Sequence, residues 1–199
     1  MPRPAFRLLV TVALLLAPSI AVAQPGHGVD GSLLAGFIHP FGGLDHLLAM
    51  TAVGLFAAHL GGRALWAVPA TFVAVMALGG VSGAAGISLP FVETAIALSV
   101  VIFGLMIFSG MAPPVLAAMA LVGIFAIFHG YAHGTEMPVS ASGVDYGIGF
   151  MVATALLHGF GITLGVAIRW FDEAPRRRAM QACGATIGLI GIGLVIGLV

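Results

Sequence analysis

Residues 91–109 read Phe-Val-Glu-Thr-Ala-Ile-Ala-Leu-Ser-Val-Val-Ile-Phe-Gly-Leu-Met-Ile-Phe-Ser, an apolar run with one charged side chain, Glu93. About 20 apolar residues in a helix are enough to cross the hydrocarbon core of a bilayer. Similar apolar segments lie at about 41–60, 64–84, 114–132, 145–169 and 180–199. The sequence therefore predicts an all-α, polytopic membrane protein with six transmembrane helices.

The composition of the whole chain agrees with this prediction. Of the 199 residues, 60% are hydrophobic and only 7% are charged. A soluble domain carries about 25% charged residues, so this chain lacks the polar surface of a water-soluble fold and the lipid bilayer is an expected partner. All seven basic residues are arginine, and they form no patch interleaved with aromatic side chains. We therefore expect no nucleic-acid partner.

The first 23 residues have the pattern of a cleavable signal peptide. Arg3 and Arg7 precede a short apolar stretch, and an Ala-x-Ala cleavage pattern ends at Ala23. Cleavage there leaves residues 24–199 as the six-helix transmembrane domain. The alternative is an uncleaved first helix. Both place Gln24 outside the cytoplasm.

The positions of the arginines predict the orientation of the helices. With Gln24 outside, the loops after the first, third and fifth apolar segments face the cytoplasm. Arg63 lies in the first of these loops, and Arg169 and residues 176–178 flank or lie in the last, whereas the outer loops contain no arginine. This distribution follows the positive-inside rule. It predicts a multi-pass protein of the bacterial inner membrane whose mature N-terminus is periplasmic.

Ionisable side chains gather in the outer half of this predicted bundle. An ionisable group in the bilayer core costs several kcal/mol, so its presence indicates a functional role. Imidazoles and carboxylates together suit divalent transition metals. We therefore predict that these residues form one metal site: His39, Asp45, His46, Glu93, His129, His133, Glu136 and, about 20 Å deep in the fifth helix at 1.5 Å per residue, His158.

The spacing within the second cluster fits one face of a helix. His129 and His133 are four residues apart, and Glu136 is seven residues beyond His129. At 100° per residue these three side chains share one face and can bind an ion together. The alternative is that Gly134 ends the helix and leaves Glu136 in a loop.

The first cluster predicts a broken helix. Between His39 and His46, Pro40 and the pair Gly42-Gly43 interrupt the helical pattern. Non-helical backbone at membrane depth is tolerated only where it lines a cavity or is buried in protein. Discontinuous helices of transporters build ion sites in this way. Asp45 either binds the ion directly or orients His46.

Some of these residues, and several others, also have simpler alternative explanations. Glu93 follows Pro90 and has the alternative role of a helix-start carboxylate favoured by the helix dipole. His158 alone is equally compatible with a core hydrogen bond, and His59 fits an interfacial residue better than a ligand. Met50, Met106, Met119 and Met151 fit ordinary core packing, because export of a soft metal calls for a denser set of Met or Cys.

These motifs resemble the HupE/UreJ family of nickel and cobalt permeases. The family is marked by a His-x5-Asp-His motif in the first mature helix, which is present here as His39, Asp45 and His46. The run Phe-His-Gly-Tyr-Ala-His-Gly-Thr-Glu at 128–136 is also similar to a family motif, as are residues 90–99 and 157–161. The resemblance covers the mature chain. It implies a secondary transporter that takes up Ni²⁺ or Co²⁺ as its substrate, without enzymatic activity and without a resident cofactor.

Two other functions remain open at this stage. A membrane-embedded hydrolase could hold Zn²⁺ with His129, His133 and His158 and use Glu136 or Glu93 as general base. A metal-sensing or accessory subunit could bind the ion without transporting it. Neither the choice of nickel over cobalt, nor proton coupling, nor the oligomeric state follows from the sequence.

Overall fold

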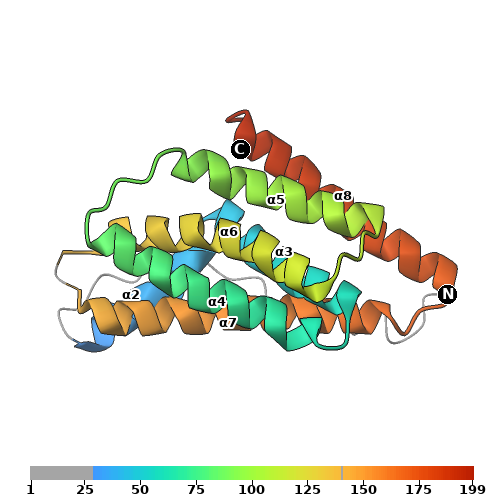
Figure 1. The fold of residues 1–199 in the computed structure, drawn as a ribbon, viewed down its shortest axis with the longest axis horizontal. Helices are drawn as coiled ribbons and strands as arrows, with labels where there is room; N and C mark the ends of the chain where they lie inside the picture. Colours follow the sequence, from blue (N-terminus) through green and yellow to red (C-terminus); the bar gives the residue numbers. More distant parts are fainter. Residues whose placement is uncertain (1–28, 140) are drawn as a thin grey trace.

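The computed structural model describes residues 29–139 and 141–199, and the predicted signal peptide lies outside this part. Every regular element within it is a helix (Figure 1): α2 (Val29–Gly42), α3 (Leu44–Leu60), α4 (Ala64–Ala84), α5 (Val92–Ser109), α6 (Val115–Thr135), α7 (Gly143–Ile168) and α8 (Glu173–Val195). Helices α4 to α8 are each long and apolar enough to cross a membrane, and α2 with α3 is a bent pair that, counted as one broken span, brings the candidates to six. The chain is therefore an all-helical, multi-pass membrane protein.

The predicted interruption of the first span is present, and it falls at Gly43. Helices α2 and α3 meet there at an angle of 85°, and Gly43 itself has an extended conformation. Pro40 stays inside α2, so the helical part of this span begins at Val29 and not near residue 41 as expected. The bend allows both His39 of α2 and His46 of α3 to contact His133 of α6.

The last helix begins earlier than the sequence predicted. We expected a polar connection over 170–179, but α8 starts at Glu173. The three arginines at positions 176–178 therefore lie inside the helix. Acidic residues at a helix N-terminus interact favourably with the helix dipole, and proline is tolerated in the first turn. Asp172, Glu173 and Pro175 therefore start a helix that the apolar pattern alone does not reveal.

Helix α3 is the centre of the molecule. It contacts every other described helix, and the residues from Ala52 to Ala58 are all buried. Helices α5 and α8 pack together along one side, α4 pairs with α6, and α7 packs against both α2 and α3 (Figure 1). The side chain of His46, in the first turn of α3, is consequently buried inside the protein, whereas Leu44 at the first position of the helix is exposed.

Glycines bring the helix backbones close together. A Cβ atom at Gly54 of α3 would collide with the backbone carbonyl of His158 in α7, and one at Gly161 would collide with that of Thr51. Gly184 and Gly188 of α8, four residues apart, lie against Gly104 of α5 in the same manner. Small residues allow this approach in lipid. The α3–α7 contact is the one that positions the candidate site.

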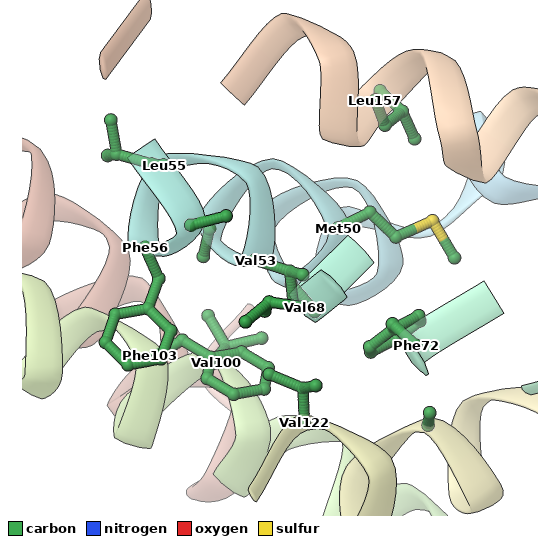
Figure 2. Packing of buried hydrophobic residues seen from close by; sticks show 14 of the residues in the cluster. Met50, Val53, Leu55, Phe56, Val68, Phe72, Val100, Phe103, Val122 and Leu157 are labelled. Atoms are coloured by element: carbon green, nitrogen blue, oxygen red, sulfur yellow. The ribbon is translucent and has the colours of Figure 1, made fainter. Parts of the chain in front are cut away.

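Most of the large buried apolar side chains of α3 lie between Met50 and the end of the helix. Figure 2 shows Phe56 and Phe103 toward one end of the buried apolar cluster and Met50 and Phe72 toward the other. Phe72 also contacts two buried histidine rings, those of His129 and His158. The interior is therefore apolar near the end of α3 and becomes polar toward its start.

Candidate metal site

Three residues form what we call the outer cluster, at the end of the bundle predicted to face the periplasm: His39, His133 and Glu136. Helix α6 continues through Gly134 to Thr135, so Glu136 directly follows the helix. Nε2 of His39 donates to Oε2 of Glu136 at 2.8 Å. One ligand atom from each of the three residues lies within 4.8 Å of the others, and the side chains of His39 and Glu136 are 31% and 49% exposed. Two imidazoles and a carboxylate can bind a transition metal there.

His46 lies at the start of α3, and Asp45 sets its orientation. Oδ1 of Asp45 accepts from the backbone N–H of His46 at 2.7 Å and from its Nδ1–H at 2.8 Å. Because a carboxylate only accepts, the imidazole proton lies on Nδ1 and Nε2 keeps a free lone pair. Nε2 is buried and has no hydrogen-bond partner among the described residues. Of the two predicted roles of Asp45, the geometry supports orientation of His46.

His129 of α6 also has an orienting partner. Oγ of Ser99 in α5 donates to the carbonyl oxygen of Ile96 at 2.6 Å and lies 3.0 Å from Nε2 of His129. Since the single hydroxyl proton is directed at the carbonyl, Oγ accepts from Nε2–H. Nδ1 of His129 keeps its lone pair, and it has no partner in the described part of the chain.

Five imidazole rings follow one another through the interior, and we call them the histidine line, in order from the outer cluster: His39, His133, His46, His129 and His158. The centroids of successive rings among the first four are 4.6 to 4.9 Å apart. Phe72 of α4 occupies the last step, because its ring lies 5.5 Å from His129 and 5.1 Å from His158. The five rings come from α2, α3, α6 and α7. Only the tertiary fold brings them together.

The deeper members of the histidine line are buried without polar partners. His129 and His133 are 0% exposed and His158 is 1% exposed. Neither ring nitrogen of His133 or of His158 has a hydrogen-bond partner among the residues described. An unpaired buried polar group costs about 1–3 kcal/mol, so a core that serves only stability rarely keeps several of them. Their lone pairs are available to a bound ion.

Glu93 is the one predicted ligand that the structure leaves outside the group. It is exposed in the first turn of α5, and no described residue forms a hydrogen bond or ion pair with it. The residue of α5 that reaches the histidine line is Ser99, six positions and about 9 Å further along the helix. The position of Glu93 fits the alternative role of a carboxylate at a helix N-terminus.

Several polar groups near the histidine line have no signal in the sequence. Ser99 is one of them. Another is Thr154, which is buried one turn before His158 in α7; its Oγ1 donates to Sδ of Met50 at 3.3 Å and lies 3.8 Å from Sδ of Met76. Met50 is a core residue as expected, but its thioether also lies beside the line. Thioether sulfur is a soft ligand type, and only the fold shows that two of them converge.

The fold and the site together define a multi-pass membrane protein with candidate transition-metal ligands along its interior. The family model described as HupE / UreJ protein matches residues 12–194. Protein HupE of Rhizobium leguminosarum bv. viciae is 48% identical over 191 residues, which is 96% of this chain and 98% of that protein. No solved structure matches the chain. The chain belongs to the HupE/UreJ family, and the resemblance inferred from its motifs is confirmed.

Proposed function

We propose that this protein is a permease of the bacterial inner membrane that takes up Ni²⁺ or Co²⁺ from the periplasm. The observation that carries the proposal is the histidine line, in which five imidazoles from four helices follow one another and most keep unpaired nitrogens. The chain's membership of the HupE/UreJ family also supports it, because the resemblance of the motifs to that family implies a nickel or cobalt permease. Imidazole-rich sites suit both metals.

The ion is first bound at the outer cluster, where Glu136 adds a negative charge to two imidazoles. It then moves to Nε2 of His46, which Asp45 holds in position. Neighbouring rings are close enough that a leaving and a receiving imidazole can both contact the ion during this step. The outer cluster offers three protein ligands and not a closed cage of four, so binding there stays weak enough for release.

Passage beyond His158 requires a conformational change. The interior past this residue is filled by fully buried apolar side chains, among them Leu55, Phe56 and Phe103. Closely packed cores of this kind have no path for a hydrated ion. We infer that the conformation described here is open toward the outer cluster and closed toward the arginine-bearing end. A second conformation with the opposite accessibility completes transport.

Uptake of radioactive nickel in a bacterial strain that lacks its own nickel importers tests this proposal. We expect His46→Ala and Asp45→Ala to reduce uptake to the level of cells without the protein, while the amount of protein in the membrane stays unchanged. Asp172→Ala is the matched control, because Asp172 is exposed at the other end of the bundle. Normal uptake by the His46→Ala variant would refute the proposal.

The zinc hydrolase alternative fits the geometry less well. It requires His129, His133 and His158 around one ion, but the ring of Phe72 contacts both His129 and His158 at the step between them. The metal content of the purified protein separates the two functions. A hydrolase retains one tightly bound Zn²⁺ per chain, whereas a permease releases its ion on dialysis against a weak chelator.

A further inference from the structure

A second feature lies at the opposite end of the bundle from the outer cluster. A cavity of about 550 Å³ opens between the ends of α3, α5 and α7 and the start of α8. Three of its lining residues are arginines: Arg169, Arg176 and Arg177. We propose that this cavity, which we call the arginine cavity, binds the phosphate group of an anionic phospholipid from the adjacent leaflet.

The arginine cavity has an excess of positive charge. Its three guanidinium groups face a single lining carboxylate, that of Glu173. Across residues 29–139 and 141–199, the ion pairs found join histidines to acids, and none involves an arginine. Guanidinium groups bind phosphate oxygens with two parallel hydrogen bonds, which makes arginine well suited to a phosphate ligand.

Two local features of the cavity lining support the binding of a polar ligand. Gly61, in the turn after α3, has φ 73° and lies directly under the guanidinium of Arg169, where a Cβ atom would come within 2.7 Å of Nη2. A glycine here gives the arginine room to lie over the turn. His59 also lines the cavity, and its Nε2 is buried with no hydrogen-bond partner among the described residues. It is a further polar group available to a phosphate.

The surroundings favour a lipid over a soluble phosphate. Trp66 and Trp170, both of which lie at this end, are 62% and 84% exposed, as expected for side chains at the level of the lipid headgroups. Exposed Leu105 and Phe108 continue from the cavity along α5 and offer a surface for acyl chains. The positive-inside rule predicts that this end faces the cytoplasmic leaflet, where basic pockets between helices bind anionic headgroups.

Thermal unfolding of the purified full-length protein in a neutral detergent tests the proposal. We expect phosphatidylglycerol to raise the unfolding temperature in a saturable manner, and phosphatidylcholine at the same concentration to have little effect. The double variant Arg176→Gln/Arg177→Gln is expected to weaken the apparent affinity for phosphatidylglycerol at least tenfold. The control is Arg63→Gln/Arg178→Gln, which removes the same charge at the same end but outside the cavity.

Three outcomes would overturn the proposal. One is equal stabilisation by phosphatidylcholine, and another is an equal loss of affinity in the two double variants, since both indicate nonspecific attraction. The third is full stabilisation by glycerol phosphate, which would assign the cavity to a soluble phosphate. Size-exclusion chromatography confirms that each variant is folded. If the first double variant is not, Arg177→Gln alone takes its place with Arg178→Gln as its control.

Discussion

In two of the buried histidines, a hydrogen-bond acceptor on a neighbouring residue fixes which ring nitrogen carries the proton. Asp45 accepts from Nδ1–H of His46, and Ser99 accepts from Nε2–H of His129. In both cases the opposite nitrogen keeps its lone pair inside the bundle. Hydrogen bonds of this kind fix the tautomer of metal-binding imidazoles and their direction. We therefore expect these partners to affect metal affinity although they do not touch the ion.

Removal of the Ser99 hydroxyl tests this role. In the Ser99→Ala variant the ring of His129 loses the acceptor that fixes its proton, so the concentration of Ni²⁺ at half-maximal uptake should rise about tenfold. The matched control is Ser109→Ala on the same helix, because that hydroxyl contacts only backbone carbonyls of α5. Initial uptake rates over a range of metal concentrations give both values. An unchanged half-saturating concentration for Ser99→Ala would contradict the assignment.

His158 allows function to be separated from stability. Neither of its ring nitrogens has a partner in the described structure, so His158→Leu removes an unpaired buried polar group that costs about 1–3 kcal/mol. We expect an unfolding temperature that is equal to or above that of the unchanged protein, together with complete loss of nickel uptake.

The His39→Leu variant should show no gain in stability. Nε2 of His39 already donates a hydrogen bond to Glu136, and the two side chains are partly exposed. Thermal unfolding and uptake, measured on both variants, test this pair of expectations. A clear loss of stability in His158→Leu would instead support the alternative in which His158 forms a core hydrogen bond.

At the scale of single residues the sequence indicates the candidate ligands but not the hydrogen-bond partners that orient them. Histidine is rare in apolar helices, so His39, His46, His129 and His133 are visible in the sequence, and the structure brings all four together. Ser99 is not visible, because serine occurs in many membrane helices for packing alone. Only the contact between α5 and α6 distinguishes it.

The break between α2 and α3 is the element that creates the outer half of the site. Because the two helices meet at 85°, His39 lies beside the end of α6 while His46 points into the bundle. Pro40 and the two glycines indicate such a break in the sequence, but its exact position follows from packing. The early start of α8 is a similar case, since its first turns carry arginines and have no apolar pattern.

Adjacent glycines at this break provide a matched pair of variants. A Cβ atom at Gly43 would come within 2.6 Å of Oδ1 of Asp45 and 3.2 Å of Nδ1 of His46, whereas one at Gly42 meets no atom within 4 Å. Gly43→Ala should therefore displace the hydrogen bond that orients His46 and lower nickel uptake at least tenfold. Gly42→Ala should leave uptake within about twofold of normal. Equal uptake by the two variants would show that the position of the Asp45 side chain is not important.

The whole molecule has two chemically different ends. Glu136 and the outer cluster lie at one end, and the described arginines, with both tryptophans, lie at the other. The sequence predicted this polarity, because the spacing of apolar segments and arginines is enough to assign sides. It could not predict that α3 occupies the centre, since that depends on glycine contacts between helices far apart in the chain.

Orientation in the membrane can be measured with single cysteines. Replacing the one native cysteine, Cys183, by alanine gives a background without thiols. Val139→Cys then places a thiol in the exposed loop between α6 and α7, beside the outer cluster, and Met111→Cys places one in the exposed loop between α5 and α6. In intact spheroplasts a membrane-impermeant maleimide should label the Val139→Cys variant and reach the Met111→Cys variant only after lysis. Uptake by both variants confirms that the labelled proteins are native. The reverse labelling pattern would place the outer cluster in the cytoplasm, and the direction proposed for metal movement would then be wrong.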